Sequence, residues 1–290
     1  MRILLTGVTG YLGSYIANAL IKNGHQVIGI KRKSSSLQRI ENIISELILY
    51  NIEDIDLLVM FRMHCKIDAV IHTATCYGRN GESSNEILSA NLIFPLKLLN
   101  ATVHSNVALF LNTDTALEKY LNPYALSKAQ FSEWGRYFAR QKQIRFLNLK
   151  LEYFFGPNED KSNFTQYVIN CCLDNIPLLK LTSGLQKRDF IYIDDVVSVY
   201  LLLLEKRDLF NDNFIEYEVG SGAAITIRQF VELIHRLTAS KTHLGFGDLP
   251  YRIGEVMYSQ AQTDKLKSLG WSCCSEIETN LKTVIERYLD

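Results

Sequence analysis

The sequence lacks the features that direct a chain to a membrane or to nucleic acid. Its 31 lysines and arginines balance 31 acids, so no overall charge attracts nucleic acid or an anionic membrane surface. The longest apolar run, near residues 196–204, is shorter than the roughly 20 residues that span a bilayer. Gly7, Thr9 and Gly10 interrupt the apolar start of the chain, unlike a signal peptide. We therefore expect a soluble, cytoplasmic protein whose anion sites are local.

Cysteine is also scarce, and its spacing argues against two common uses. The six cysteines are Cys65, Cys76 and two adjacent pairs, 171–172 and 273–274. No C-x-x-C unit, the usual spacing of zinc and redox sites, is present. We expect no metal and no disulfide, and reduced cysteines that act mainly as small apolar residues.

Apolar runs of strand length alternate with helix-length segments from the first residue onward. Helical patterns at 11–22, 86–103 and 124–141 separate these runs. Apolar strands that do not alternate with polar residues are typical of a parallel sheet covered on both faces. The first half therefore predicts an α/β fold with a doubly wound parallel sheet. The strand-like runs lie at 3–6, 26–30, 47–50, 69–73, 107–112 and 145–151.

After Gly156 and Pro157 the pattern loosens into shorter elements. No repeat, low-complexity tract or long linker separates the two halves, so we expect them to pack together. We predict a first domain over residues 1–155, to which a later segment of about 189–220 returns. A smaller α/β domain covers mainly 156–290. In the second half, helices are expected at 164–173, 195–205, 226–237 and 275–289, and a strand around Phe190.

A glycine-rich turn, T-G-V-T-G-Y-L-G from Thr6 to Gly13, follows the first strand and opens the first helix. Glycines permit a tight turn and a close backbone approach to a pyrophosphate, and the helix N-terminus presents N–H groups to the anion. The spacing is G-x-x-G-x-x-G, so its position after a strand carries more weight than the glycines alone. The turn predicts a Rossmann-like dinucleotide-binding domain. The expected contacts here are Gly7, Thr9, Gly10, Tyr11, Leu12 and Gly13.

The end of the second strand indicates which dinucleotide is used. An NAD enzyme usually places an acid there, which accepts from the ribose 2′-hydroxyl and would repel a 2′-phosphate. This chain has Lys31, Arg32, Lys33 and Ser34 instead. Three cations and a hydroxyl suit charge-assisted bonds to the additional phosphate of NADP(H). The alternative is a solvated basic loop that tolerates either cofactor.

Tyr124 and Lys128 lie four residues apart, early in a predicted helix, so they share one face. A nearby ammonium favours the phenolate, so we expect the Tyr124 pKa to be lowered and the phenol to exchange a proton with a sugar oxygen near neutral pH. Thr113 follows the strand 107–112, at the carboxyl edge of the sheet, where ligands bind. These three residues are the predicted catalytic group.

The glycine turn, Thr113, and Tyr124 with Lys128 resemble the extended short-chain dehydrogenase/reductase family over essentially the whole chain. Residues 188–196 resemble the R-D-F-x-x-V-D-D-V signature of its nucleotide-sugar enzymes. Residues 252–255 resemble the family's R-x-G-E segment, whose arginine binds the substrate pyrophosphate. Asp194 and Asp195 are instead expected to cap the following helix.

The resemblance extends the predicted site. Lys128 would also hold the nicotinamide ribose, and the segment 151–157 would pass the nicotinamide. The further cofactor contacts that it implies are Asn51, Ile52, Thr73, Ala74, Thr75, Asn91, Tyr153 and Phe154. The substrate contacts that it implies are Cys76, Tyr77, Thr115, Glu152, Asn163, Phe164, Arg188, Arg252 and Glu255.

The residues after Thr113 bear on the reaction. Dehydratases of this family follow the threonine with an Asp-Glu pair, whereas this chain has Asp114 and Thr115, so dehydration is disfavoured. Epimerases recycle a tightly held NAD, which fits a basic cofactor loop less well. The resemblance therefore favours NADPH-dependent reduction of the 4-keto group of a nucleotide-linked 4-keto-6-deoxyhexose. In more detail, the resemblance favours reductases of CDP-linked 4-keto sugars in surface polysaccharide synthesis.

Two alternatives stay open: a nucleotide-sugar epimerase with bound NAD(P), and a non-catalytic, NADPH-binding regulatory protein on the same fold. The interval from Thr113 to Tyr124 is shorter than is usual in the family, and Asn51 stands where an adenine-contacting acid is common. As in the family, the helices at 86–103 and 124–141 are expected to form a four-helix interface in a homodimer.

Overall fold

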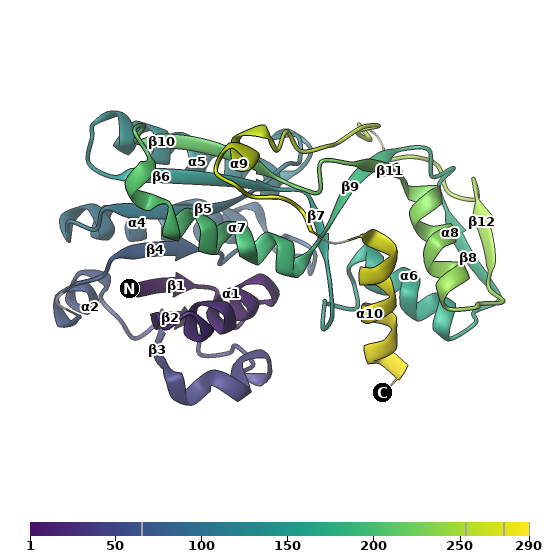
Figure 1. Cartoon of the computed structure of the whole chain (residues 1–290), viewed down its shortest axis with the longest axis horizontal. Helices are drawn as coiled ribbons and strands as arrows, with labels where there is room; N and C mark the ends of the chain where they lie inside the picture. The colour runs from purple at the N-terminus through teal and green to yellow at the C-terminus, as the bar shows by residue number, and fades with distance from the viewer. Residues whose placement is uncertain (65, 253, 275, 290) are drawn as a thin grey trace. The chain divides into compact units, whose positions relative to one another are not determined.

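The computed structural model describes residues 1–64, 66–252, 254–274 and 276–289 (Figure 1). The chain divides into two compact units. The first comprises Met1–Leu151 and Val197–Tyr217, and the second comprises Glu152–Val196 and Glu218–Asp290. The chain therefore leaves the first unit near residue 151, returns to it near 197, and leaves it again near 217.

A seven-stranded sheet forms the centre of the first unit, in the order β10-β6-β5-β4-β1-β2-β3. The pairs β1 with β2, β1 with β4, β2 with β3, β4 with β5 and β5 with β6 are all parallel. The strand order reverses at β1, which is where open α/β sheets bind ligands. The predicted doubly wound, Rossmann-like fold is confirmed. The strands are β1 (Arg2–Thr6), β2 (Gln26–Lys31), β3 (Leu47–Asn51), β4 (Ala69–His72), β5 (Leu109–Thr115), β6 (Arg145–Leu151) and β10 (Phe214–Val219).

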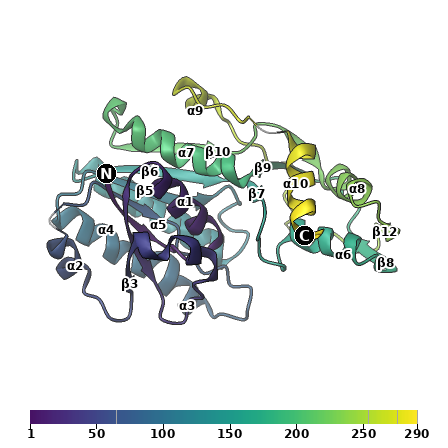
Figure 2. The ribbon, with the colours of Figure 1, turned by 60° about the horizontal axis from the view of Figure 1, so that its bottom comes forward.

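Helices cover this sheet because its strands are apolar on both faces. Leu4, Val70 and Phe110 belong to one buried core, which includes Leu98 of α4 and Phe131 of α5. Strand residues that alternate with these point to the opposite face and are also fully buried. Helices α4 and α5 contact each other and lie close together in Figure 2. The α-helices include α1 (Tyr11–Lys22), α2 (Leu57–Met63), α3 (Ser84–Leu88), α4 (Phe94–His104), α5 (Pro123–Arg140) and α7 (Ile193–Glu205), joined by the 3₁₀ segments η1 (Gln38–Glu46) and η3 (Arg207–Leu209).

Two elements differ from the sequence prediction in ways that affect the site. The helix expected at 86–103 is divided by a π-helical turn, η2 (Ser89–Ile93), between α3 and α4. Strand β5 starts later than expected and runs on to Thr115, because Asp114 and Thr115 still pair with β6. Thr113 therefore lies within the strand rather than after it.

The second unit holds two small sheets, with the orders β11-β9-β7 and β12-β8. Its core includes Phe190 of β9 and Phe230 of α8, whose rings stack with 3.7 Å between centroids. None of the helices in the described ranges is long and apolar enough to cross a membrane. The elements are β7 (Tyr153–Phe155), α6 (Phe164–Leu173), β8 (Leu178–Leu181), β9 (Lys187–Tyr192), β11 (Ala224–Thr226), α8 (Ile227–Leu237), β12 (His243–Phe246), α9 (Asp264–Ser268) and α10 (Ile277–Leu289).

Asp194 and Asp195 lie in the first turn of α7, which begins at Ile193, so they are not at its cap position. An acid in the first turn still interacts favourably with the helix dipole. Cys171 and Cys172 are buried free thiols, whereas Cys65 lies outside the described residues.

Candidate active site

At two of its positions, Gly7 and Gly13, the glycine turn leaves no room for a side chain. Gly7 has φ +71°, and a Cβ on it would lie 2.7 Å from the Ala74 nitrogen. A Cβ on Gly13 would lie 2.0 Å from the Gly7 oxygen. Gly10, the N-cap of α1, has no side-chain capping bond, and the first turn of α1 contains no acid. A close-packed turn at an uncapped, acid-free helix N-terminus fits a dinucleotide phosphate.

The segment after β4 is hydrogen-bonded to the start of this turn. The Thr73 hydroxyl donates to the Thr6 carbonyl at 2.8 Å, and the Ala74 N–H donates to the Thr6 hydroxyl at 3.4 Å. The Thr6 hydroxyl also lies 2.7 Å from Nδ1 of His72, a fully buried residue whose pKa is held well below its usual value by burial. Thr73 and Ala74 therefore lie beside the glycine turn.

The basic loop is partly neutralised by its own neighbours. Lys31 Nζ donates to Asn51 Oδ1 at 2.8 Å, and Lys33 Nζ lies 2.6 Å from Asp54 Oδ1. Arg32 is exposed and forms no ion pair with any residue the structure describes. Asn51 is neutral, so only Lys33 has its charge matched, and Arg32 is the cation whose side chain forms neither a hydrogen bond nor an ion pair within the described residues. Ile52, which follows Asn51, packs against the core of the first unit.

Thr113, Tyr124 and Lys128 all belong to the first unit, on β5 and α5. The helix begins at Pro123, with the Asn122 side chain accepting from the Ala125 N–H at 2.8 Å. Lys128 is 2% exposed, and burial lowers its pKa to about 8 although a nearby carboxylate raises it. A buried ammonium of this kind exerts a strong local field because water does not screen it.

The expectation that the Tyr124 pKa is lowered is wrong for this structure. Burial of the phenol raises its pKa well above the usual value, and the charges of Tyr77 and Asp114 raise it further. A hydrogen bond with Thr115 and the charge of Arg79 act in the opposite direction but do not compensate. The sequence spacing gave the helix face correctly, but it did not reveal the desolvation. Tyr124 is therefore a neutral phenol, able to donate its proton.

Asp114 is buried and is held by hydrogen bonds, so it is not a free base. Asn148 Nδ2 donates to it at 2.8 Å, and the Thr115 N–H donates to it at 2.8 Å. Its charge raises the pKa of both Tyr124 and Lys128. Asp114 thus favours the protonated state of both groups.

Asn91, one of the predicted cofactor contacts, is fully buried and hydrogen-bonded on both sides of its amide. Its Oδ1 accepts from the Thr75 hydroxyl at 3.1 Å and from the Cys76 N–H at 2.7 Å. Its Nδ2 donates to the Cys76 carbonyl at 2.8 Å and to the Ser127 hydroxyl at 3.1 Å. Asn91, in the π-helical turn, therefore fixes the segment 75–76 against the helix that carries Lys128. Such turns often mark functional sites.

Tyr77 and Tyr200 complete this part of the site. The Tyr77 ring, 47% exposed, lies 5.0 Å from the Tyr124 ring between centroids, and Arg79 lies 4.9 Å from the Tyr77 centroid. The Thr113 hydroxyl lies 2.6 Å from the hydroxyl of Tyr200. The sequence prediction missed Arg79 and Tyr200. A tyrosine inside the apolar run 196–204 was the available signal for Tyr200, because a buried phenol needs a polar partner.

The remaining predicted substrate residues lie in the second unit. Arg188 is 5% exposed, and its Nη2 lies 2.5 Å from Glu255 Oε1. Its guanidinium also lies 5.6 Å from the Tyr153 ring centroid. Arg252 is exposed and forms no ion pair within the described part of the chain, and its carbonyl accepts from the Glu255 N–H at 3.0 Å. Arg188 is therefore already paired, whereas Arg252 retains an unmatched charge.

Four further predicted residues also belong to this unit. Asn163 occupies the N-cap position of α6, and its Nδ2 donates to Glu159 Oε1 at 2.9 Å. Phe164, at the start of the helix, is 37% exposed, and Phe154 is half-buried. Glu152 is buried and contacts Ser259, at 2.7 Å from Oε1 and 2.9 Å from Oε2. The structure thus places the predicted residues in two groups, one in each unit.

Asp189, next to Arg188 in the predicted signature, has a structural role. It is fully buried and accepts from the N–H groups of Ser221, Gly222 and Ala261 and from the Ser221 hydroxyl. A carboxylate with four donors is fully satisfied. It therefore ties β9 to the turn at 220–222.

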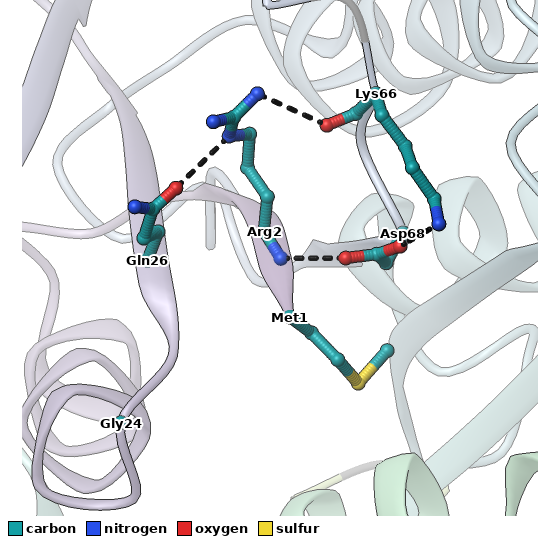
Figure 3. A pocket seen from close by; sticks show the side chains of 6 residues that line it. All are labelled: Met1, Arg2, Gly24, Gln26, Lys66 and Asp68. Atoms are coloured by element: carbon teal, nitrogen blue, oxygen red, sulfur yellow. Dashed lines mark hydrogen bonds and ion pairs between the residues drawn. The ribbon is translucent and has the colours of Figure 1, made fainter.

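A hollow of about 410 Å³ lies at the amino-terminal edge of the large sheet and contains none of the predicted site residues (Figure 3). Its polar groups pair with one another. The Arg2 N–H donates to Asp68 Oδ2 at 2.7 Å, and Lys66 Nζ lies 3.4 Å from Asp68 Oδ1. Because parallel sheets bind ligands at the opposite, carboxyl edge, we do not assign this hollow to the site.

A family model described as "NAD dependent epimerase/dehydratase family" matches residues 3–220. Among curated proteins, the chain is 32% identical to CDP-abequose synthase of Salmonella typhimurium over 294 residues, covering 98% of this chain and 97% of that protein. It is 34% identical to CDP-abequose synthase of Salmonella muenchen over 291 residues, with the same coverage of 98% and 97%.

Among solved structures, the chain resembles a UDP-glucose 4-epimerase of Thermotoga maritima in complex with UDP-glucose. The TM-score is 0.84 at 24% identity, and the match covers 100% of this chain and 99% of the other. At that identity the likeness establishes the fold alone.

Proposed function

Since the chain belongs to the NAD dependent epimerase/dehydratase family, we propose that it is an NADPH-dependent reductase acting on the 4-keto group of a nucleotide-linked 4-keto-6-deoxyhexose. We favour a CDP-sugar as the substrate. The relatives named CDP-abequose synthase, similar over nearly the full length, support this choice. The physiological setting that we propose is deoxysugar synthesis for a surface polysaccharide such as lipopolysaccharide.

The placement of Tyr124 and Lys128 on α5, beside Asp114 of β5, is the observation that carries this proposal. Reduction of a ketone needs one hydride on carbon and one proton on oxygen, so its acid must start protonated. Burial and the Asp114 charge hold Tyr124 in that state.

The residues of the first unit provide each remaining part of the reaction. A reduced nicotinamide dinucleotide, when bound, supplies the hydride. The close-packed turn at Gly7 and Gly13 fits its pyrophosphate. Thr113 donates a hydrogen bond to the carbonyl oxygen and Tyr124 transfers the proton to it. The Lys128 ammonium then stabilises the phenolate that remains.

Arg32 supports the choice of NADPH over NADH. Lys33 is paired with Asp54 and Lys31 is hydrogen-bonded to the neutral Asn51, whereas the Arg32 side chain forms neither kind of contact within the described residues. A planar guanidinium forms bidentate hydrogen bonds with phosphate oxygens. We assign the 2′-phosphate contact to Arg32.

Arg252 supports a nucleoside diphosphate as the anionic part of the substrate. Arg252 is exposed and forms no ion pair with a residue in the described ranges, whereas Arg188 is neutralised by Glu255. A simple alcohol substrate has no group that needs such a cation. We assign the diphosphate contact to Arg252. Arg188 instead positions Glu255, through their ion pair, and the Tyr153 ring.

The test is to incubate the protein with NADPH and, separately, with CDP-, dTDP-, GDP- and UDP-4-keto-6-deoxyhexoses. We expect NADPH absorbance to fall with the CDP-sugar and NMR of the product to show a new hydroxyl at carbon 4. The Tyr124→Phe variant should bind NADPH normally and consume none. Saturable NADPH binding without consumption for every sugar would contradict the reductase and favour a regulatory, non-catalytic binder.

Epimerisation with a bound nicotinamide cofactor is the second candidate. It is favoured by the ion pair of Lys33 with Asp54, which leaves less charge in the basic loop for a 2′-phosphate than the sequence suggested. An epimerase would interconvert two nucleotide hexoses without net consumption of cofactor. Mass spectrometry of the purified protein, together with NMR of UDP- and CDP-hexoses incubated without added NADPH, distinguishes the two reactions.

A further inference from the structure

Tyr200 lies against the residue that we propose orients the substrate oxygen. Its hydroxyl oxygen is 2.6 Å from the Thr113 hydroxyl oxygen, and both residues belong to the first unit although 87 positions separate them. Tyr200 is completely buried. Within the described ranges, the Thr113 hydroxyl is the only hydrogen-bond partner of this phenol.

The direction of this hydrogen bond follows from counting protons. Each hydroxyl carries one proton. If Thr113 donated to Tyr200, the buried phenol proton would have no acceptor among the described residues, and an unpaired buried donor is destabilising. Burial also raises the pKa of Tyr200, so the phenol keeps its proton. Tyr200 is therefore the donor and Thr113 the acceptor.

With one lone pair of Thr113 occupied by Tyr200, the Thr113 proton is available for a different acceptor. Thr113 is β-branched and lies within β5, so its side chain has few rotamers. Hydrogen bonds in a chain polarise one another, which makes the terminal hydroxyl a stronger donor.

We propose that Tyr200 is a positioning residue that fixes the Thr113 hydroxyl as a hydrogen-bond donor toward the carbonyl oxygen of the substrate. This inference rests on the proposed reductase function and adds to it a residue that does not touch substrate or cofactor. Tyr200 acts only through Thr113, and this dependence provides the test.

The first experiment replaces Tyr200 with phenylalanine, which removes the hydroxyl and keeps the ring. We expect kcat to fall about tenfold with KM for the keto sugar nearly unchanged, because the lost interaction is needed in the transition state. The matched control is Tyr217→Phe. Tyr217 is 3% exposed, belongs to the same unit and makes no hydrogen bond through its hydroxyl within the described ranges. Equal kcat values for both variants would overturn the proposal.

A double-mutant cycle separates positioning from a general structural effect. In a Thr113→Val background the added Tyr200→Phe change should leave kcat unchanged. The Thr113 hydroxyl, through which Tyr200 acts on the substrate, is already absent there. The double variant should also be more stable than Thr113→Val alone, since it no longer buries an unpaired phenol. Losses in kcat that multiply would mean that Tyr200 acts independently of Thr113.

NMR of the protein without cofactor or substrate provides a readout that does not depend on activity. A slowly exchanging Tyr200 hydroxyl proton, close to the Thr113 methyl group and lost in Thr113→Val, is the expected result. A protected proton on Thr113 instead would reverse the donor and overturn the proposal. If wild-type protein reduced no keto sugar, the proposed function would fail while this measurement still decided the donor direction.

Discussion

The Ser259 hydroxyl lies within hydrogen-bond distance of both carboxylate oxygens of Glu152, at 2.7 and 2.9 Å. A serine has one hydroxyl proton and donates to one oxygen at a time, so a proton on Glu152 lets the second contact be a hydrogen bond as well. Burial raises the Glu152 pKa to about 7, and the charges of Asp189 and Glu218 contribute in the same direction. Glu152 therefore titrates near neutral pH.

This raised pKa predicts a pH dependence of stability. Below pH 4.5 the carboxyl is protonated in both states, and between pH 4.5 and 7 the unfolded chain loses its proton first. The free energy of unfolding should therefore decrease across this window, by at most about 3 kcal/mol. Urea unfolding from pH 4.5 to 7.5 measures it. Glu152→Gln should reduce the slope, whereas Glu133→Gln, at a side chain that is 73% exposed, should not. Identical slopes for wild type and Glu152→Gln would contradict the assignment.

Alanine at Gly13 should prevent dinucleotide binding. Its Cβ would lie 2.0 Å from the Gly7 carbonyl oxygen, so the turn must open. Gly10→Ala is the matched comparison, because there the nearest atom to a Cβ is 3.1 Å away. We expect the Kd for NADPH to rise more than 100-fold in Gly13→Ala and less than tenfold in Gly10→Ala, by fluorescence titration. Circular dichroism checks folding. Equal losses in the two variants would argue against the glycine turn as the site of the dinucleotide phosphate.

Arg32→Ala should weaken binding of NADPH selectively. A charge-assisted hydrogen bond contributes about 1.5–3 kcal/mol, which corresponds to an increase in Kd of roughly 10- to 100-fold. The Kd for NADH should change little. Lys33→Ala should have a smaller effect because Lys33 is already paired with Asp54. Titration of each variant with both dinucleotides is the measurement, and an equal loss for NADH would contradict a 2′-phosphate contact.

Arg252→Ala should raise KM for the nucleotide sugar about tenfold with little change in kcat, since a diphosphate is bound equally in the ground and transition states. Arg236→Ala is the control. Arg236 is a cation of the same unit, 64% exposed in its side chain and paired with Glu278. Steady-state kinetics with the CDP-4-keto sugar compares them. An unchanged KM in Arg252→Ala would contradict the assignment of the diphosphate contact to Arg252.

We propose that the chain forms a homodimer through a four-helix interface that includes α5. Trp134 and Tyr137 of α5 are 42% and 54% exposed, and Ile93, beside α4, is 47% exposed. Exposed apolar groups of this size on adjacent helices suit burial against a second copy. Light scattering should give a dimer mass for wild type and a monomer mass for Tyr137→Glu. A monomeric wild type would contradict this.

Local features of the sequence determined the fold and much of the candidate site. The alternation of apolar strands and helices predicted the parallel sheet because each element has its own periodicity. The glycine turn was recognisable because only glycine fits where Gly13 meets the Gly7 oxygen. The four-residue spacing placed Tyr124 and Lys128 on one helix, since a helical repeat depends on sequence distance alone.

Tertiary structure decided the properties that depend on burial and on distant neighbours. The direction of the Tyr124 pKa shift follows from desolvation and from Asp114, neither of which a spacing reveals. The contact between Thr113 and Tyr200 joins positions 87 residues apart. Sequence patterns specify which groups are present, but the electrostatic state of each group is set by the water that folding removes and by the charges that folding brings near.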